Sequence, residues 1–207
     1  MTALLLAVDD HVKRLMAILR KTHQDKNTLV VFVSDNGWLQ GQHRIPGDKF
    51  LPYEESLRVP LILRGPGVPK GKTVRGQVSN IDFAATLLDV AGAKAGRPQD
   101  GVSLMPTARD PKRHPNKIVE IEAPAPLFEQ NVPVNAWDRP YKGVRTERYT
   151  YVRYTETGDV ELYDRKVDPG ELLNRASFPA YAKVKAHLAA KLAKLDKCRG
   201  KSCRISP

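Results

Sequence analysis

The stretch Thr28-Leu-Val-Val-Phe-Val-Ser-Asp-Asn-Gly-Trp38 decides the fold class of this chain. Its first six residues form a short, continuous apolar run rich in valine, which is typical of a strand covered on both faces, as in a parallel sheet. Polar residues follow the strand directly, and ligands of α/β proteins collect just outside the carboxyl ends of such strands. The stretch therefore predicts an α/β layer with a candidate site at the edge of its sheet.

The segments on either side of this strand fit the same layer. Apolar side chains recur every three or four residues from 1 to 21, which predicts an amphipathic helix. A second apolar run at 60–63 predicts another strand, and the pattern at 81–90 predicts a helix that Gly92 ends. Residues 94–115 are rich in proline and glycine and are expected to form a loop or linker. We predict a first, α/β unit over residues 1–115.

Residues 116–207 are expected to form a smaller second unit. A strand is predicted at 117–121, and aromatic or β-branched residues then alternate with charged ones at 141–145, 149–154 and 160–163. Thr157-Gly158-Asp159 supplies a hairpin turn between the last two runs. The pattern predicts a half-exposed antiparallel meander, and an amphipathic helix is predicted over 179–197.

Positive charge accumulates toward the C-terminal end. The 207 residues carry a net charge of +11, and residues 138–207 alone hold 16 basic and 9 acidic side chains. A basic surface favours polyanions such as nucleic acid, anionic lipid or sulfated sugar, although a solvated surface with a basic tail explains the same count. No recognition-helix or stacking-aromatic motif is present, so we do not expect a nucleic-acid partner. No apolar run approaches the ~20 residues of a transmembrane segment.

The two cysteines and the N-terminal residues bear on the compartment. Cys198 and Cys203 are close enough in sequence for a small-loop disulfide, which would imply an oxidising compartment; two free thiols are the alternative. Residues 2–8 are apolar, but no basic segment precedes them and Asp9 and Asp10 interrupt the run, so a secretory signal is not expected. The chain itself therefore leaves its localisation unknown.

The loop after the first strand holds the residues best suited to chemistry. Asp35 supplies a carboxylate and Asn36 an amide oxygen, and such hard ligands suit Ca²⁺ or Mg²⁺. His43 can donate a hydrogen bond or transfer a proton, and Lys49 can neutralise an anionic oxygen. Taken singly, these residues fit an ordinary turn with solvated side chains better than they fit a site.

Together, several segments resemble one family. The run SDNGWLQGQHRIPGDKFLPYEESLRVPLILRGPG, residues 34–67, resembles the second signature region of the type I sulfatases, members of the alkaline-phosphatase-like superfamily. The likeness continues through VSNIDFAATLLDVAG (78–92), DGVSLMP (100–106), YKGVRTERYTYVRY (141–154) and ELYDRKVDPGELLNRA (161–176). It implies a partial alkaline-phosphatase-like α/β sandwich followed by a smaller subdomain of antiparallel sheet plus helix.

The resemblance also implies roles for single residues. Asp35 and Asn36 match the pair that helps to hold the family's divalent cation, usually calcium. Lys49 matches the lysine that contacts a sulfate oxygen, and His43 lies in a common GxH element near the substrate. The family's nucleophile is a formylglycine made from the first residue of a C/S-x-P/A-x-R motif. The local pattern looks nearest to N-acetylglucosamine-6-sulfatase-like members, which act on sulfated sugars such as those of glycosaminoglycans.

The sequence departs from the family pattern at its centre. No Cys or Ser here stands in the nucleophile motif, and the family's first acidic metal pair is missing. The chain therefore resembles the C-terminal portion of a sulfatase, whose partner would be the missing N-terminal catalytic half, and we expect the chain alone to be inactive. The parent enzyme is expected to be exported to the periplasm, the outside of the cell or the lysosome.

Three hypotheses remain open at this stage. The first is a sulfuric-ester hydrolase that acts on a sulfated carbohydrate or another sulfate ester. The second is a phosphodiesterase or phosphonate hydrolase of the same superfamily. The third is a non-catalytic, polyanion-binding relic that retains the scaffold and its basic surface.

Overall fold

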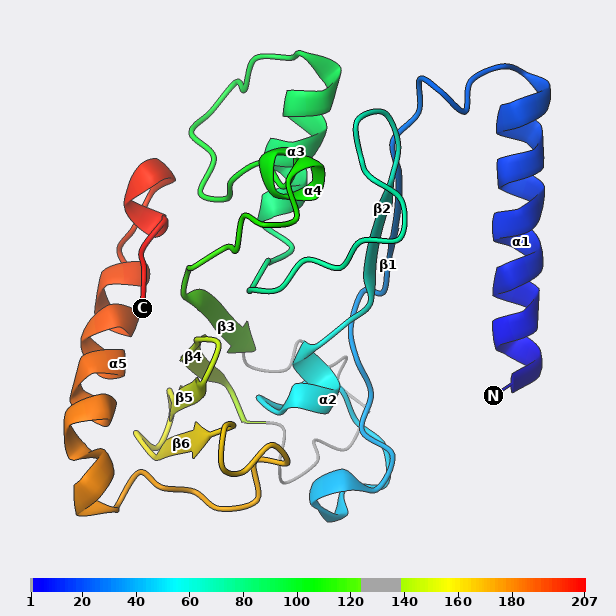
Figure 1. The fold of residues 1–207 in the computed structure, drawn as a ribbon. Helices are drawn as coiled ribbons and strands as arrows, with labels where there is room; N and C mark the ends of the chain where they lie inside the picture. The colour runs from blue at the N-terminus through cyan, green and yellow to red at the C-terminus, as the bar shows by residue number, and fades with distance from the viewer. Residues whose placement is uncertain (1, 124–138) are drawn as a thin grey trace, which may run out of the picture.

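The computed structural model describes residues 2–123 and 139–207 of the chain (Figure 1). The helices are α1 (Thr2–Lys21), α2 (Glu54–Leu57), α3 (Asp82–Ala91), α4 (Met105–Arg109) and α5 (Ala182–Leu195). The strands are β1 (Val30–Val33), β2 (Leu61–Arg64), β3 (Val119–Ala123), β4 (Tyr141–Arg145), β5 (Tyr149–Tyr154) and β6 (Val160–Asp164). Short 3₁₀ turns are η1 (Gln42–Arg44), η2 (Pro179–Tyr181) and η3 (Gly200–Cys203).

The main core lies in the C-terminal sheet, whose strands are antiparallel in the order β3-β4-β5-β6. Val144, Tyr151 and Leu162 face one another across three neighbouring strands. They pack against Leu188 and Leu192 of α5, which covers this face (Figure 1). Burying this cross-strand row removes apolar surface from water and is the main source of stability here.

The opposite face of the same sheet is also buried, which corrects the expected half-exposed meander. Tyr141, Val152 and Tyr154 form a second cluster with Ile121, and Leu57 of α2 packs on it. The alternation of apolar and charged residues predicted that one face of the sheet would be exposed to solvent. That face is instead covered by the segment around α2, which the strand pattern alone does not reveal.

β1 and β2 form a separate two-stranded ribbon, so the prediction of a strand covered on both faces in a parallel sheet is wrong for this chain. The two strands are antiparallel, with Val31 opposite Leu63. Phe32 is 39% exposed and Ile62 is 59% exposed. Their apolar character fits a strand in a larger sheet, but no further described strand pairs with them.

α1 confirms the predicted N-terminal helix, and much of its apolar surface is exposed. Leu5 is 63% exposed and Leu15 is 48% exposed. Arg64 of β2 donates through Nη1 to the sulfur of Met16, 3.2 Å away. Within the described residues, no helix has the length and apolar character needed to cross a membrane.

The expected linker at 94–115 contains a helix, α4, which corrects that prediction. α4 is anchored to α3 because the backbone N–H of Leu104 donates to the buried hydroxyl of Thr86 over 2.9 Å. Asp82, fully buried at the start of α3, accepts from the backbone N–H of Val102 and pairs with Lys117. The carboxylate in the first turn of α3 thus holds both Val102 and Lys117 close to this helix.

The C-terminal end confirms two predictions. η2 and α5 occupy the predicted helical stretch, and Cys198 and Cys203 are joined by a disulfide. Both cysteines follow the C-terminal end of α5 and pack against the core that this helix covers. The division into units at residue 115 stays a prediction, and residues 124–138 of the second unit lie outside the described part of the chain.

Candidate active-site loop

The predicted site residues lie on one loop, residues 34–58, which we call the site loop. Gly37 holds its two ends together, since its N–H donates to the carbonyl of Ser56 over 2.9 Å. A Cβ at Gly37 would lie 1.9 Å from the carbonyl oxygen of Glu55, so only glycine fits there. The end of β1 is thereby fastened to α2.

Asp35 and Asn36 follow the end of β1, and each has a side-chain oxygen without a hydrogen bond among the described residues. One carboxylate oxygen of Asp35 accepts from the N–H of Asn36 over 2.9 Å. The side-chain amide of Asn36 donates to the carbonyl of Gly37 over 2.8 Å. Within the described part of the chain, the second Asp35 oxygen and the Asn36 amide oxygen have no partner. Two hard oxygen donors therefore stand side by side.

His43 is held inside the loop by an aromatic stack. Its ring lies 3.7 Å from that of Tyr53, nearly parallel to it, and its side chain is only 11% exposed. Its Nε2 is buried without a hydrogen bond and lies 3.8 Å from a carboxylate oxygen of Glu55. His43 has a positive φ of 52°, an uncommon backbone state that often accompanies functional sites.

Tyr53, the stacking partner of His43, has a raised pKa. Burial, followed by the nearby negative charge of Glu161, raises the pKa of Tyr53 to about 12. The phenol therefore stays neutral at physiological pH. Tyr53 can support the imidazole as a flat apolar surface without adding a charge beside it.

Lys49 is positioned through its backbone, while its ammonium group is available. Its carbonyl accepts from the hydroxyl of Ser56. Its Nζ lies 5.6 Å from the ring centroid of Phe50 and has no ion-pair partner among the residues described. An ammonium group without a carboxylate partner can bind an anionic oxygen.

The structure brings the four predicted residues onto one hydrogen-bonded frame, centred on residues 53–56. The backbone around Asp35 and Asn36 and that of Lys49 both contact Ser56, and His43 contacts Tyr53 and Glu55. Within residues 2–123 and 139–207, no group of three or more His, Cys, Asp or Glu side chains could hold a metal ion. Asp35 and Asn36 by themselves offer fewer oxygen donors than a divalent cation takes.

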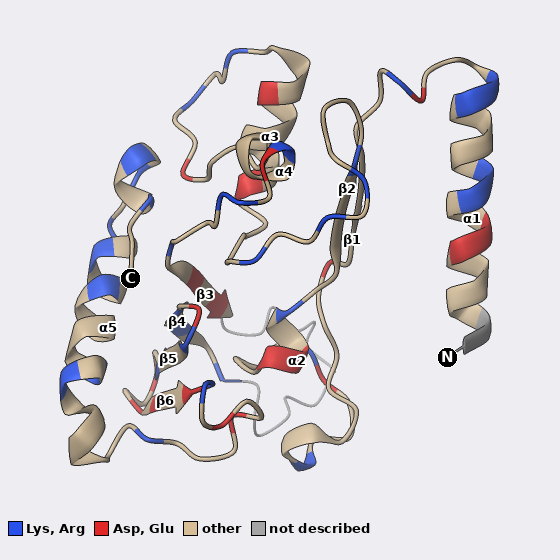
Figure 2. Ribbon diagram, viewed as in Figure 1, with Lys and Arg blue, Asp and Glu red and all other residues tan. Residues whose placement is uncertain are grey.

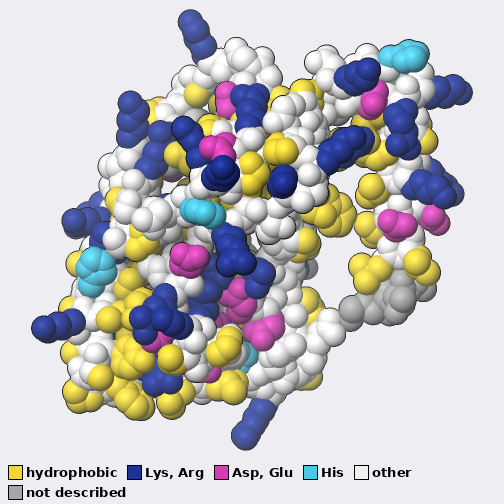
Figure 3. Space-filling model, viewed as in Figure 1, with side chains coloured by type: hydrophobic (Ala, Val, Ile, Leu, Met, Phe, Trp, Pro, Cys, Tyr) yellow, Lys and Arg dark blue, Asp and Glu magenta, His cyan; other side chains and the backbone are white. Residues whose placement is uncertain are grey.

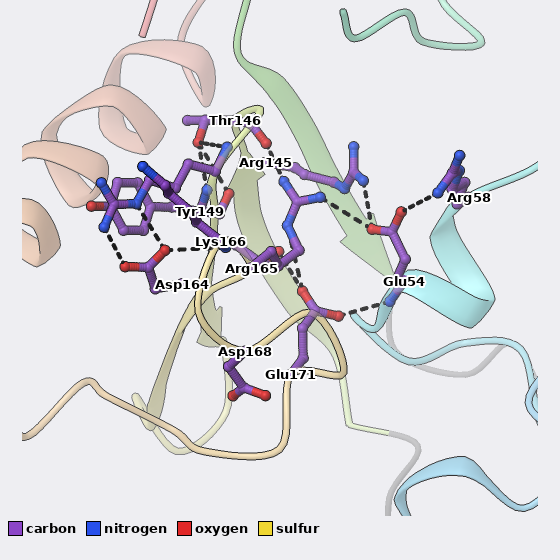
Figure 4. Close-up of polar contacts among 12 residues, drawn as sticks. Glu54, Arg58, Arg145, Thr146, Tyr149, Asp164, Arg165, Lys166, Asp168 and Glu171 are labelled. Carbon is purple, nitrogen blue, oxygen red and sulfur yellow. Dashed lines mark hydrogen bonds and ion pairs between the residues drawn. The ribbon is translucent and has the colours of Figure 1, made fainter.

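Glu54, which sequence reasoning missed, ties the site loop to the C-terminal sheet (Figure 4). Its carboxylate accepts from Arg145 of β4 over 2.5 Å and from Arg165 after β6 over 3.2 Å. Burial alone would raise the pKa of Glu54, but the two guanidinium groups outweigh it and lower that pKa. The ionised carboxylate thus fastens α2 to the end of β4 and to the residue that follows β6.

Glu171 completes this junction from the opposite side. One carboxylate oxygen accepts from the backbone N–H of Glu54 over 2.8 Å (Figure 4). The other accepts from the hydroxyl of Thr150 over 2.6 Å. Burial raises the pKa of Glu171. Glu54 and Glu171 are 117 positions apart, so no local spacing could have paired them. The only signal was that both lie in segments of the family resemblance.

Residues 41–198 match the family described as N-sulphoglucosamine sulphohydrolase, C-terminal. The chain belongs to this sulfatase family. The match contains the site loop from Gly41 onward, the C-terminal sheet and α5, so the residues that join loop to sheet all lie within it.

Two curated relatives illustrate the sequence likeness. Human N-acetylglucosamine-6-sulfatase is 32% identical over 225 residues, which cover 97% of this chain and 41% of that protein. The N-acetylglucosamine-6-O-sulfatase of Bacteroides thetaiotaomicron is 32% identical over 197 residues, covering 94% of this chain and 35% of that protein. The chain thus spans about two fifths or less of the length of these relatives.

Two solved structures illustrate the likeness in fold. A protein solved in complex with its substrate D-glucosamine-2-N,6-O-disulfate superposes with a TM-score of 0.82 at 32% identity, over 93% of this chain and 39% of that one. The phosphonate monoester hydrolase of Agrobacterium radiobacter superposes with a TM-score of 0.75 at 29% identity, over 91% and 39%. These comparisons confirm a partial sulfatase fold of the alkaline-phosphatase-like type.

Proposed function

We propose that this chain forms the C-terminal part of an enzyme that hydrolyses sulfate esters of sugars. The observation that carries the proposal is the superposition, over nearly the whole chain, on a protein whose substrate is a doubly sulfated glucosamine. The formylglycine nucleophile expected of the family would lie outside this chain. Without a nucleophile no covalent step can begin, so the chain alone is expected to be inactive.

Asp35 and Asn36 would supply two ligands of a divalent cation, with Ca²⁺ the best match. Their unpartnered oxygens are hard donors, which fits calcium, but calcium takes six to eight oxygens. The remaining ligands would come from the rest of the enzyme. When bound, such a cation stabilises negative charge on the sulfate oxygens.

Lys49 and His43 would act on the sulfate group and its surroundings. The Lys49 ammonium, which has no carboxylate partner among the described residues, would pair with a sulfate oxygen and stabilise charge that develops there. The buried Nε2 of His43 lacks a hydrogen bond, so it can form one with a bound sugar or sulfate. The stack on Tyr53 would keep that nitrogen oriented.

The partner of this chain would be the remaining catalytic portion of the enzyme. The exposed apolar residues of the β1–β2 ribbon and α1 give it a surface to cover. Covering the ribbon would also place further strands beside the carboxyl end of β1, where Asp35 and Asn36 lie.

A related phosphonate or phosphodiester hydrolase is the second candidate. Its specific support is the superposition on the phosphonate monoester hydrolase, whose TM-score of 0.75 is only slightly below that of the sulfated-glucosamine complex. The site loop offers a cation site and an ammonium group, and either would suit a phosphonate oxygen as well as a sulfate oxygen.

A hybrid enzyme tests the proposal. This chain would replace the matching portion of the Bacteroides relative, and sulfate release from N-acetylglucosamine-6-sulfate would be compared with turnover of a phosphonate monoester. We expect sulfate release, and Lys49→Met to lower kcat by roughly 10²- to 10³-fold because a charge-stabilising group is lost. Lys26→Met, in the exposed turn before β1, is the matched control and should change kcat by less than about twofold.

Two results would overturn these assignments. If the hybrid with Lys49→Met is folded and keeps its full kcat, then Lys49 does not act in the site. A hybrid that turns over the phosphonate monoester far faster than the sulfate ester would favour the second candidate.

A further inference from the structure

α5 has two chemically distinct faces. Leu188, Leu192 and Leu195 are buried against the C-terminal sheet. The other face carries four basic side chains at spacings of four, four and three residues, which places them in one row. We call them the α5 basic stripe: Lys183, His187, Lys191 and Lys194. Figure 2 shows blue bands recurring along α5, and Figure 3 shows basic side chains and a histidine over it at the left edge.

The stripe is not explained by contacts within the described chain. Lys183, His187 and Lys194 are exposed and have no partner among the residues described. Lys191 donates to the carbonyl of Ser206 over 2.5 Å, which leaves its charge uncompensated. Like charges along one helix face repel, so the arrangement costs stability rather than adding it.

A groove of about 580 Å³ adjoins the stripe at the N-terminal half of α5. Lys183 and His187 line it from the helix, and Arg148 and Glu147 line it from the turn between β4 and β5. Nε and Nη2 of Arg148 donate to the two carboxylate oxygens of Asp164, at 2.8 and 2.6 Å, which fixes the position of the guanidinium. Arg148 thus adds a fixed guanidinium beside the row, where Asp164, its ion-pair partner, and Glu147 are the neighbouring acidic groups.

We infer that the α5 basic stripe and this groove form a docking surface for a sulfated glycan chain. The inference rests on the proposed function only for the choice of polyanion. A row of separate ammonium groups suits repeated anionic groups on a linear polymer. Single-stranded nucleic acid would need open aromatic faces for its bases, and Arg148 occupies one face of the Tyr149 ring, 4.8 Å from its centroid.

The surface would hold a polymeric substrate apart from the site loop. The site loop packs on the opposite face of the C-terminal sheet, through Leu57 and Glu54, while α5 covers the other face. A long glycan bound along α5 would raise the local concentration of its sulfated units near the enzyme without occupying the site itself. Short substrates would gain nothing from it.

Binding of a fluorescent heparin-derived dodecasaccharide to the 207-residue chain tests this surface. The double variant Lys183→Gln/Lys194→Gln removes two charges from the stripe. The control Lys70→Gln/Lys72→Gln removes two exposed charges from the loop after β2. We expect the stripe variant to bind about tenfold more weakly at 0.1 M salt and the control to change by less than about twofold.

Equal weakening in both double variants would overturn the proposal, because it would show that only net charge matters. Equally tight binding of a single-stranded DNA of matched charge would overturn the choice of a sulfated glycan. The assay needs no turnover, so an inactive hybrid enzyme with intact, stripe-dependent binding would separate failure of the proposed function from failure of this inference.

Discussion

The two sheets in the described part of the chain, the C-terminal sheet and the β1–β2 ribbon, are both antiparallel and both apolar. They differ in how far other segments cover their faces. In the C-terminal sheet, Val144 and Val152 are fully buried on opposite faces. In the β1–β2 ribbon, Phe32 and Ile62 are 39% and 59% exposed. The described residues therefore supply a complete core for the C-terminal sheet but leave the ribbon partly exposed. The site loop continues from β1 of this ribbon, and its own buried residues, Leu39, Ile45 and Leu51, lie beyond the strand.

Core truncation should show the largest difference between the two regions. Leu162→Ala removes a fully buried side chain from the C-terminal sheet and should lower the free energy of unfolding by about 2–5 kcal/mol. Ile62→Ala, in the ribbon, should cost less than about 1 kcal/mol because its side chain is already exposed. Urea unfolding followed by circular dichroism measures both; equal losses would show that the ribbon is covered as well as the sheet.

The junction between the regions should be the next most sensitive point. Glu54→Gln leaves Arg145 and Arg165 without their shared carboxylate and should cost about 2–3 kcal/mol of unfolding free energy. Glu156→Gln, on the exposed β5–β6 turn, is the matched control and should lie within about 0.5 kcal/mol of the wild type. If the two variants behave alike in thermal unfolding, Glu54 does not join the loop to the sheet.

The same ion pairs should make stability fall in acid. The pKa of Glu54 is lower in the folded chain than its ordinary value of 4.5, so its contribution is present above that pH. It is lost as the pH falls through the folded pKa. Melting temperatures between pH 7 and pH 3 should therefore drop more steeply for the wild type than for Glu54→Gln. Parallel curves would contradict the ion pairing, because the other carboxylates are common to both proteins.

The disulfide should contribute the smallest of these effects. Cys198 and Cys203 are five positions apart, and closing so short a loop stabilises by roughly 2 kcal/mol or less. Cys198→Ser/Cys203→Ser should therefore lower the melting temperature modestly, measured against wild type kept oxidised. A loss of melting temperature as large as that caused by Leu162→Ala would mean that the disulfide stabilises the whole core under α5 and not only the chain beyond the end of this helix.

The sequence predicted local structure well wherever one segment determines it. The α5 pattern, the hairpin at Thr157-Gly158-Asp159 and the N-terminal helix are all set by neighbouring residues, and each is present in the structure. Partners far along the chain escaped prediction. The valine run at 30–33 indicated a strand but not an antiparallel partner, and the cover of the sheet by Leu57 depends on the fold of the whole loop.

The membership of the candidate site stays a prediction, and the contacts that support its residues were not predicted. Asp35, Asn36, His43 and Lys49 were singled out by residue type and family pattern, and the structure places them on one frame. Their roles in binding a cation and sulfate remain predictions. The network of Glu54 and Glu171 that holds this frame joins residues over 100 positions apart, and only tertiary structure reveals it.

Amide hydrogen exchange of the 207-residue chain tests the contrast between the two regions most directly. We expect the amides of β4 and β5, which are paired on both sides and covered on both faces, to exchange only through global opening. The amides of β1 and β2 should exchange at least about 100-fold faster, because the ribbon can open without disturbing that core. Equal protection in both sheets would contradict the claim that the β1–β2 ribbon lacks the cover that the C-terminal sheet has.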